Sequence, residues 1–401
     1  MANRFEIPQI CENISAACCV SETVRIQAKS DVYSFGRVLY RHGSVPPGKV
    51  YRITLRYETR DVNGSVDAVA NWLKKDGTPQ ARGYLEKPAP GLLRLEYHIP
   101  ENVTVLELEY RMWSNGGGEV NFSMPQVECL GDSAPRHATL ATAWFSTAQD
   151  RTCAKNLADI LRIADNAGTA LDKPDILVFS EAIYGRGVPD KTLQERALML
   201  DSEPLAQIAK KAANYGMYIA VGVHLNDGEQ IKNVALIYGR SGGLEGMYAK
   251  THLTMCEREW GIVSGNDQPV FQLDFGRVGV LICWDHFFAE PARLLHMKGA
   301  EVVIVPTAGD TAYQSRARAI DSGAYYVMGG TNTPGSSIII NPLGETIAQV
   351  TDTEKGYSSV TVDLNQRQHL YWLSVGPCDG EGRDVYLRER RTDLYGGLSE
   401  N

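Results

Sequence analysis

Three residues with reactive side chains each sit at the end of an apolar, strand-like run. Glu181 follows DILVF, Lys250 follows LEGMYA, and Cys283 ends RVGVLIC. The carboxyl ends of strands in an α/β sheet share one edge, so we expect the carboxylate, the ammonium and the thiol to lie on the same rim. A carboxylate can accept the proton of a thiol, and a thiolate can attack a carbonyl carbon. This placement therefore indicates nucleophilic catalysis by Cys283.

Each of these residues also has an ordinary structural interpretation. A lone cysteine after an apolar strand is more often a buried core residue. Glu181 can be a helix cap or a surface acid, and Lys250 can be a solvated lysine. The same placement at three strand ends favours the catalytic interpretation. The start of the helix predicted at 290–298, after Trp284-Asp285-His286, would add free N–H donors, which together with a nearby cation lower the pKa of a thiol.

The segments around these residues resemble the nitrilase, or carbon-nitrogen hydrolase, superfamily. They are VFSEAIYG, GMYAKTHLTMCERE, GRVGVLICWDHFFAEPARLLHMKGAEVVIVPTAG and RARAIDSGAYYVMGGTN…SSIIINPLGETIAQV, and the resemblance runs from about 138 to 365. It implies a four-layer αββα sandwich, a triad of Glu181, Lys250 and Cys283, no cofactor, and dimers or larger assemblies. Glu257 matches the second glutamate often found near the triad, and Glu259 is the alternative.

Two departures from the usual motifs leave the substrate open. Ser180 stands before Glu181, where a proline is usual. Trp284, after the cysteine, resembles nitrilases, whereas Asp285 is commoner in amidases. We expect a hydrolase of non-peptide carbon–nitrogen bonds that acts on a small linear amide. A nitrilase or an N-carbamoyl amidase with the same triad is the near alternative.

The expected mechanism gives each residue a role. Cys283 attacks the carbonyl carbon, and Glu181 takes the thiol proton, protonates the departing amine and then activates water. Lys250 and the backbone N–H of Trp284 hold the oxyanion. Glu257 orients Lys250 or the substrate. Further contacts to the substrate are expected from Tyr184, His286 and Thr307.

Other catalytic arrangements fit the sequence less well. Gly239 to Gly243 satisfy G-x-S-x-G, but a strand-like run follows, so these glycines indicate a hairpin turn. His286 lies only three residues after Cys283, within one helical turn, which disfavours a Cys–His pair and leaves a pocket-wall or packed histidine. The sequence has no P-loop and no dinucleotide fingerprint. The carboxylates are not arranged as a metal site.

Composition and charge limit the classes of binding partner and the cellular compartment that we expect. The 401 residues include 40 Lys+Arg and 48 Asp+Glu, for a net charge of −8. A net negative chain without a basic block disfavours nucleic-acid and anionic-membrane binding. No apolar run approaches the ~18 residues of a membrane span. The N-terminus lacks a basic start followed by an apolar stretch, so we expect a cytoplasmic protein whose eight cysteines are reduced.

Two patterns divide the chain into the elements that must position these residues. Residues 1–133 alternate apolar and polar positions between Gly, Asn and Pro turns, which predicts a jelly-roll-like β-sandwich, loosely similar to carbohydrate-binding modules. Residues 137–365 alternate strands with helices, which predicts an α/β catalytic domain. Residues 366–401 are predicted to form a C-terminal arm. The helices are expected at 150–166, 203–215, 290–298 and 311–322.

A binding protein is the alternative from another class. In that case the sandwich would dock a glycan or a protein partner, and the α/β domain would be a degenerate scaffold. Trp72 and Trp113 are the only tryptophans of the sandwich. They could stack on a sugar, although core packing is the commoner fate of a strand tryptophan. The intact triad favours an enzyme with a small-molecule substrate, assembled as a homodimer or larger homo-oligomer.

Overall fold

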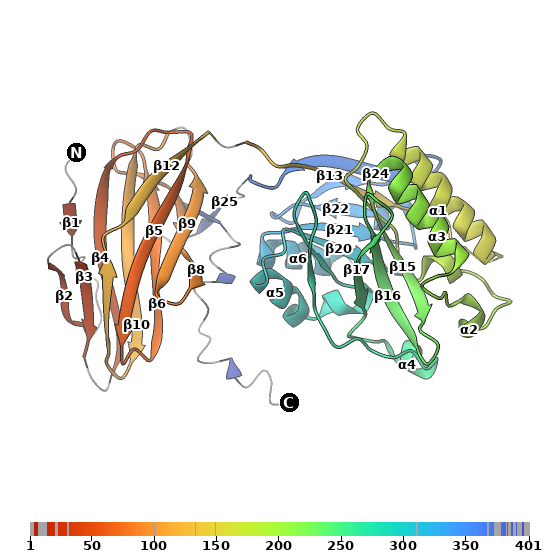
Figure 1. Ribbon diagram of the computed structural model, residues 1–401, viewed down its shortest axis with the longest axis horizontal. Coiled ribbons are helices and arrows are strands. Elements are labelled where there is room, and N and C mark those ends of the chain that lie inside the picture. Colours follow the sequence, from red (N-terminus) through yellow and green to blue (C-terminus); the bar gives the residue numbers. More distant parts are fainter. Residues whose placement is uncertain are drawn as a thin grey trace. The chain divides into compact units, whose positions relative to one another are not determined.

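The computed structural model divides the chain into two compact units, which are residues 1–134 with 369–401, and residues 135–368 (Figure 1). The structure describes residues 4–6, 14–20, 23–29, 32–99, 102–132, 134–148, 150–309, 312–366 and short pieces between 369 and 396.

The first unit consists of antiparallel strands, and its described residues between 4 and 132 form no helix. The five-stranded sheet has the order β1 (Arg4–Glu6), β4 (Tyr33–Ser44), β10 (Val105–Asn115), β6 (Gly64–Leu73) and β7 (Pro79–Tyr84). The other sheet has the order β2 (Ile14–Val20), β3 (Thr23–Ala28), β11 (Glu119–Ser123), β5 (Lys49–Arg60), β9 (Leu92–His98) and β8 (Glu86–Ala89). A further strand, β12 (Gln126–Asp132), also pairs with β5.

Buried and more exposed residues alternate along many of these strands, and the buried ones form one hydrophobic core that the two sheets share. Leu108 and Tyr110 of β10 are fully buried in the same cluster as Ile53 and Leu55 of β5. Successive residues of a strand point to opposite faces, so the alternate positions of β10, such as Glu109 and Arg111, face away from this core. Trp72 belongs to the core, with no exposed surface and its ring stacked on Tyr97 at 5.6 Å. It is therefore not available to stack on a sugar.

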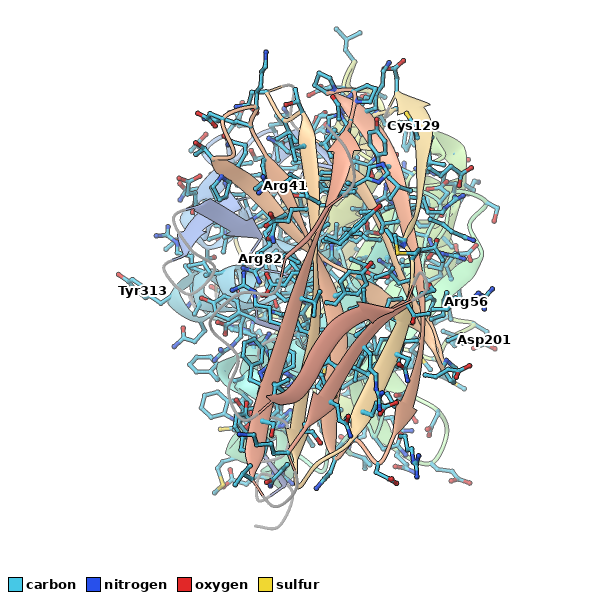
Figure 2. All side chains as sticks on the ribbon, turned by 90° about the vertical axis from the view of Figure 1, so that its left-hand side faces the viewer. Arg41, Arg56, Arg82, Cys129, Asp201 and Tyr313 are labelled. Atoms are coloured by element: carbon cyan, nitrogen blue, oxygen red, sulfur yellow. The ribbon has the colours of Figure 1, made fainter. Side chains whose placement is uncertain are left out.

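The other face of the five-stranded sheet carries charged side chains. Arg111 donates to both carboxylate oxygens of Asp67 at 2.7 and 2.9 Å, and all but a few per cent of both residues is buried. The guanidinium of Arg111 also lies 4.6 Å from the ring centre of Trp113. Arg41 and Arg82 come from β4 and β7 of the same sheet (Figure 2).

The second unit contains two six-stranded sheets. One has the order β17 (Leu244–Ala249), β16 (Ile231–Tyr238), β15 (Tyr218–Asn226), β14 (Ile176–Val178), β13 (His137–Ala143) and β24 (Tyr357–Asp363). The other has the order β18 (Val270–Gln272), β19 (Arg277–Val280), β20 (Val302–Pro306), β21 (Tyr325–Gly329), β22 (Ile338–Ile340) and β23 (Thr346–Gln349).

Helices contribute to separate cores on the two sheets (Figure 1). The cluster that includes Ile160 of α1 (Cys153–Gly168) and Ile208 of α3 (Glu203–Tyr215) lies on the β14–β15 sheet. A second cluster combines Leu295 of α5 (Ala289–Met297) and Ala319 of α6 (Ala312–Ser322) with β20 and β21. A third cluster contains residues of both sheets, such as Val178 and Val280.

Two predicted boundaries are wrong for a backbone reason. The first helix begins at Cys153 rather than at 150, because Asp150 has a φ of 73° and Thr152 is the N-cap, whose side chain accepts from the Lys155 N–H. The strand predicted to run through Cys283 ends at Val280. Short helices not predicted from the sequence are η1 (Ile183–Gly185), α2 (Leu193–Arg196), α4 (Met255–Glu259), η2 (Cys283–Phe287) and η3 (Pro334–Ser336).

Most of the predicted arm, 366–401, lies outside the described residues. Its described pieces include β25 (His369–Trp372) and β26 (Cys378–Glu381), which pair antiparallel. These strands belong to the first unit, where β26 lies beside β7. Of the helices in the described ranges, none combines the length and the apolar character needed to cross a membrane.

Candidate active site

The residues predicted to do chemistry come from both sheets of the second unit. Glu181 follows β14, and Lys250 follows β17 directly, in one sheet. Cys283 follows β19, which belongs to the other sheet. The expectation of a single shared rim is therefore wrong. Apolar runs buried on both faces do not reveal which strands pair, so the sequence pattern could not separate the two sheets.

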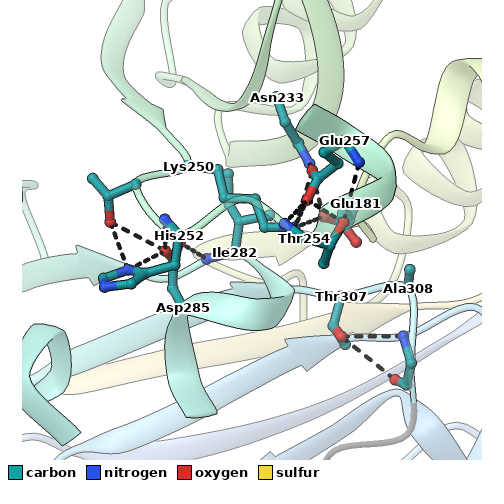
Figure 3. Close-up of polar contacts among 12 residues, drawn as sticks. Glu181, Asn233, Lys250, His252, Thr254, Glu257, Ile282, Asp285, Thr307 and Ala308 are labelled. Atoms are coloured by element: carbon teal, nitrogen blue, oxygen red, sulfur yellow. Dashed lines mark hydrogen bonds and ion pairs between the residues drawn. The ribbon is translucent and has the colours of Figure 1, made fainter. Parts of the chain in front are cut away.

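Lys250 is the centre of a buried ionic cluster (Figure 3). Its Nζ donates to Glu181 Oε1 at 2.7 Å and to Glu257 Oε2 at 2.9 Å. Asn233 Nδ2 donates to the Oε1 atoms of the same two glutamates, at 2.7 Å each. An ammonium and an amide thus hold the two carboxylates together, and the side chains of all three charged residues are less than 10% exposed.

The charges around Lys250 and Glu257 shift the pKa of each toward its charged form. Burial alone would lower the pKa of Lys250, but the charges of Glu181, Cys283 and Glu257 raise it above its ordinary value. Burial would likewise raise the pKa of Glu257, yet the Lys250 ammonium and the hydrogen bonds from Asn233 and Thr254 hold it below its usual range. Lys250 is therefore a fixed cation rather than a proton donor.

The short helix α4 positions the second glutamate. Thr254 caps it, and Glu257 accepts from the Thr254 N–H at 2.8 Å and from its hydroxyl at 2.9 Å, which is a capping box. This local pairing aims the Glu257 carboxylate back toward Lys250. Glu259 is exposed on the same helix. Of the two candidates from the sequence, the structure brings Glu257 to Lys250.

Cys283 has a backbone conformation that is unusual for a residue with a side chain. Its φ is 44°, in the left-handed region that costs a non-glycine residue about 1–2 kcal/mol. Strained residues of this kind are concentrated at functional sites. The position begins η2, so the thiol stands at a sharp turn between strand and helix.

The surroundings of the thiol act on its pKa in both directions. Burial and then the Glu181 carboxylate raise the pKa of Cys283, while Lys250 and hydrogen bonds with the Ala308 backbone and the Thr307 side chain lower it. The net shift is upward. The expectation of a lowered thiol pKa is therefore wrong, because burial and a neighbouring carboxylate outweigh the cation. A thiol that stays protonated at rest needs a base when it attacks.

Trp284 presents a backbone donor beside the thiol. Within the described part of the chain its N–H has no backbone acceptor outside η2, as is usual for the first residues of a helix. Trp284 is 38% exposed, and the centre of its indole lies 4.6 Å from the ring centre of Phe287. This backbone N–H is the candidate for a second donor to an oxyanion formed at the thiol.

Asp285 ties the turn of Cys283 to the chain segment that follows Lys250. It is completely buried and accepts from the Ile282 N–H at 2.9 Å and from the His252 N–H at 2.8 Å. The hydroxyl groups of Tyr248 and Thr251 also donate to it, at 2.8 and 3.1 Å. One carboxylate thus links segments of two different sheets, as Figure 3 shows for Ile282 and His252.

The three residues predicted to contact the substrate lie in different surroundings. Thr307 is fully buried and hydrogen-bonds the Cys283 thiol. His286 is also fully buried, with its ring 5.2 Å from that of Phe287, which favours a packing role. Tyr184 packs at the edge of the α1 core. Burial, and then its interaction with Cys153, raise the pKa of Tyr184. Thr307 is therefore the one that the structure brings to Cys283.

Sequence reasoning missed the residues that orient the cluster. Asn233 is a buried amide in a largely apolar strand, a pattern that indicates a polar role for its side chain. Asp285 offered a weaker signal, as an acid that directly follows Cys283 and Trp284. Ala308 contacts the thiol through its backbone, and a contact of this kind cannot be inferred from the residue type. Among the described residues, no group of three or more His, Cys, Asp or Glu is placed to hold a metal ion.

Comparisons with known proteins cover the part of the chain that carries these residues. The family model described as carbon-nitrogen hydrolase matches residues 143–371. A probable nitrilase of Schizosaccharomyces pombe is 33% identical over 238 residues, 55% of this chain and 84% of that protein. A nitrilase of Pyrococcus abyssi is 34% identical over 194 residues, 46% of this chain and 71% of that protein.

Solved structures share the fold. A carbon-nitrogen hydrolase from Helicobacter pylori has a TM-score of 0.55 at 18% identity, covering 66% of this chain and all of that one (100%). An amidase from Nesterenkonia sp. has a TM-score of 0.52 at 22% identity, covering 66% of this chain and 98% of that one. With the family model matching more than half of its length, the chain belongs to the carbon-nitrogen hydrolase family.

Proposed function

We propose that the protein hydrolyses a small linear amide, with Cys283 as the nucleophile. One observation carries the proposal: Lys250 Nζ lies 2.7 Å from Glu181 Oε1, beside a thiol held in a strained turn. A base, a fixed cation and a nucleophile are the groups that acyl transfer from nitrogen requires. The cofactor-free and metal-free chemistry of a thiol is sufficient for this reaction.

The proposed reaction has two halves. Glu181 takes the thiol proton as the Cys283 sulfur bonds to the carbonyl carbon, and the carbonyl oxygen becomes an oxyanion held by Lys250 and the Trp284 N–H. The C–N bond then breaks, Glu181 returns the proton to the departing amine, and a thioester remains. Glu181 next deprotonates water, which attacks the thioester and releases the acid and the thiol. Glu257 positions Lys250 throughout.

Hydrolysis of a nitrile is the second candidate. Relatives at 33% and 34% identity are named as nitrilases, which is the observation that favours it. The same thiol would add to the nitrile carbon, and the nitrogen would receive protons through Glu181. An N-carbamoyl amidase is a further variant of the same chemistry. Measuring ammonia released from amides, carbamoyl compounds and nitriles separates these possibilities.

We also infer how the chain is organised around this reaction. The three core clusters of the second unit support a four-layer αββα arrangement for the catalytic residues 137–365. The shared core of the first unit supports a β-sandwich. A glycan-binding role for that sandwich has less support, because Trp72 is buried. We place the protein in the cytoplasm as a homodimer or larger homo-oligomer.

The test compares Cys283→Ala with Cys129→Ala, which removes an exposed cysteine of the first unit (Figure 2). We expect Cys283→Ala to abolish ammonia release and Cys129→Ala to retain it. Loss of one small thiol should leave the fold intact, which circular dichroism checks. Full activity of Cys283→Ala on any substrate of the panel would refute the proposal.

A further inference from the structure

Arg186 places a guanidinium beside the nucleophile. Its Nη2 donates to the carbonyl oxygen of Ala308 at 3.5 Å. The backbone of the same residue hydrogen-bonds the Cys283 thiol. Ala308 therefore touches both groups, and the guanidinium lies within reach of a small molecule bound at the sulfur.

No carboxylate neutralises this guanidinium in the described part of the chain. Other arginines of the second unit have carboxylate partners there, such as Arg240 with Asp274 at 2.6 Å and Arg318 with Asp321 at 3.0 Å. The glutamates of the site, Glu181 and Glu257, are held by Lys250 and Asn233 instead. Asp310 lies outside the described residues. Arg186 thus keeps N–H donors for a ligand.

The loop that carries Arg186 is held rigidly. Asn156, which is completely buried, donates through Nδ2 to the carbonyl oxygens of Tyr184 at 2.9 Å and Arg186 at 2.8 Å. Gly187 has a φ of 65°, and a Cβ there would lie 2.3 Å from the Thr147 carbonyl oxygen. The backbone of Arg186 is therefore fixed before any ligand arrives, which reduces the entropy lost on binding.

The neighbouring basic side chains do not offer a second free cation. Arg196 donates to the carbonyl oxygens of Gly185 at 3.1 Å and Thr192 at 3.3 Å, so it braces the loop. Burial lowers the pKa of His224 to about 4, which leaves its ring neutral near pH 7. Arg196 keeps its charge, but its printed donors are directed at its own loop, so in the described part of the chain Arg186 is the guanidinium that contacts Ala308 beside the thiol.

We propose that Arg186 binds a carboxylate of the substrate, so that the enzyme prefers small amides that carry a negative charge over neutral amides of the same size. A guanidinium presents two parallel N–H donors that match a carboxylate, which a lysine cannot reproduce. This proposal rests on the proposed function, because it takes the thiol of Cys283 as the point where the amide carbon is attacked.

The first test needs no turnover. Iodoacetate and iodoacetamide differ in charge but little in size, and each alkylates a thiolate with loss of iodide. Mass spectrometry gives the rate of alkylation by iodoacetate divided by the rate by iodoacetamide at Cys283. This ratio is normalised by the same ratio at the exposed Cys129 of the same molecule. We expect Arg186→Gln to lower this normalised ratio by about 10- to 100-fold, the range of a charge-assisted hydrogen bond. Arg186→Lys should retain part of it.

The control is Arg316→Gln, which removes an exposed arginine of α6. This variant should leave the normalised ratio unchanged. A ratio that Arg186→Gln leaves unchanged would overturn the carboxylate site. An equal fall in both alkylation rates would also overturn it, because Arg186 would then merely support the loop.

The second test uses turnover and separates the two proposals. The specificity ratio is kcat/KM for succinamate divided by that for butanamide, and Arg186→Gln should lower it by a similar factor while butanamide hydrolysis is kept. If the wild type favours iodoacetate at Cys283 but hydrolyses no amide, the proposed function fails and the carboxylate site stands. If it hydrolyses both amides with equal kcat/KM, the carboxylate site fails alone.

Discussion

The same ammonium group of Lys250 serves two purposes. It neutralises two buried carboxylates and it faces the thiol. A compact ammonium can contact Glu181 and Glu257 at once and still direct a donor toward an oxyanion. The planar guanidinium of an arginine spreads its donors over a larger fork. The identity of this residue therefore matters beyond its charge.

We predict that Lys250→Ala lowers kcat by about 100- to 1000-fold, the usual effect of losing one oxyanion donor. Acylation and thioester hydrolysis should both slow, because each passes through a tetrahedral oxyanion. Lys250→Arg should restore little. Single-turnover kinetics with an activated ester measure the two steps separately. A defect confined to one step would show that Lys250 does not hold the oxyanion.

The pKa of the Cys283 thiol should lie above that of a free cysteine, and its two charged neighbours should shift this pKa in opposite directions. Burial and Glu181 raise the pKa of Cys283, so Glu181→Gln should lower the midpoint of its pH–alkylation curve. Lys250 lowers the pKa of the same thiol, so Lys250→Ala should raise the midpoint. Iodoacetamide labelling followed by mass spectrometry measures both. Shifts of the same sign in the two variants would contradict this electrostatic account.

At the level of elements, Asp285 fixes the turn of η2 relative to the segment after β17. The residues that donate to it come from both segments, so the carboxylate fixes the position of Cys283 relative to Lys250. Asp285→Asn keeps the shape but replaces one acceptor oxygen with a donor. It should lower the free energy of unfolding by about 1–3 kcal/mol, the cost of leaving buried polar groups unsatisfied.

A positioning role for Asp285 predicts more than lost stability. Asp285→Asn should lower kcat and leave KM nearly unchanged, because the turn and Lys250 are misaligned while the pocket wall remains. Asp172→Asn, at an exposed aspartate of the second unit, is the control and should change neither quantity. Denaturant titration measures the free energy of unfolding, and steady-state kinetics measure kcat and KM. A loss of stability with normal kcat would reduce Asp285 to a structural residue.

The sequence predicted the elements of the second unit better than their assembly. The helix expected at 203–215 is confirmed, and the strand ends of Glu181 and Lys250 were marked by short apolar runs. The turn at Cys283 was not predictable, because hydropathy continues through VGVLIC whereas the backbone turns to a positive φ. Contacts such as Asn233 with two glutamates depend on tertiary packing, which periodicity does not encode.

At the scale of the whole molecule, exposed apolar side chains support self-association. Leu294 and Met297 of α5 are 44% and 53% exposed, and Tyr313 of α6 is 84% exposed. Exposed apolar groups that cluster on neighbouring helices favour an interface. We predict a dimer or larger even-numbered oligomer by sedimentation at micromolar concentration, and a shift toward monomer for Leu294→Glu. Leu171→Glu, at another exposed leucine, is the control. A monomeric wild type would contradict this prediction.

The central claim is that Cys283 forms a thioester whose formation and breakdown both depend on Glu181. Glu181→Gln keeps the shape of the base without its proton affinity. An activated ester has a leaving group that needs no protonation, so this variant should acylate slowly and then stall. Intact-protein and peptide mass spectrometry after incubation with the ester measure this most directly. We predict an acyl adduct that accumulates on Cys283. Turnover by Glu181→Gln at the wild-type rate, with no adduct on Cys283, would contradict the account.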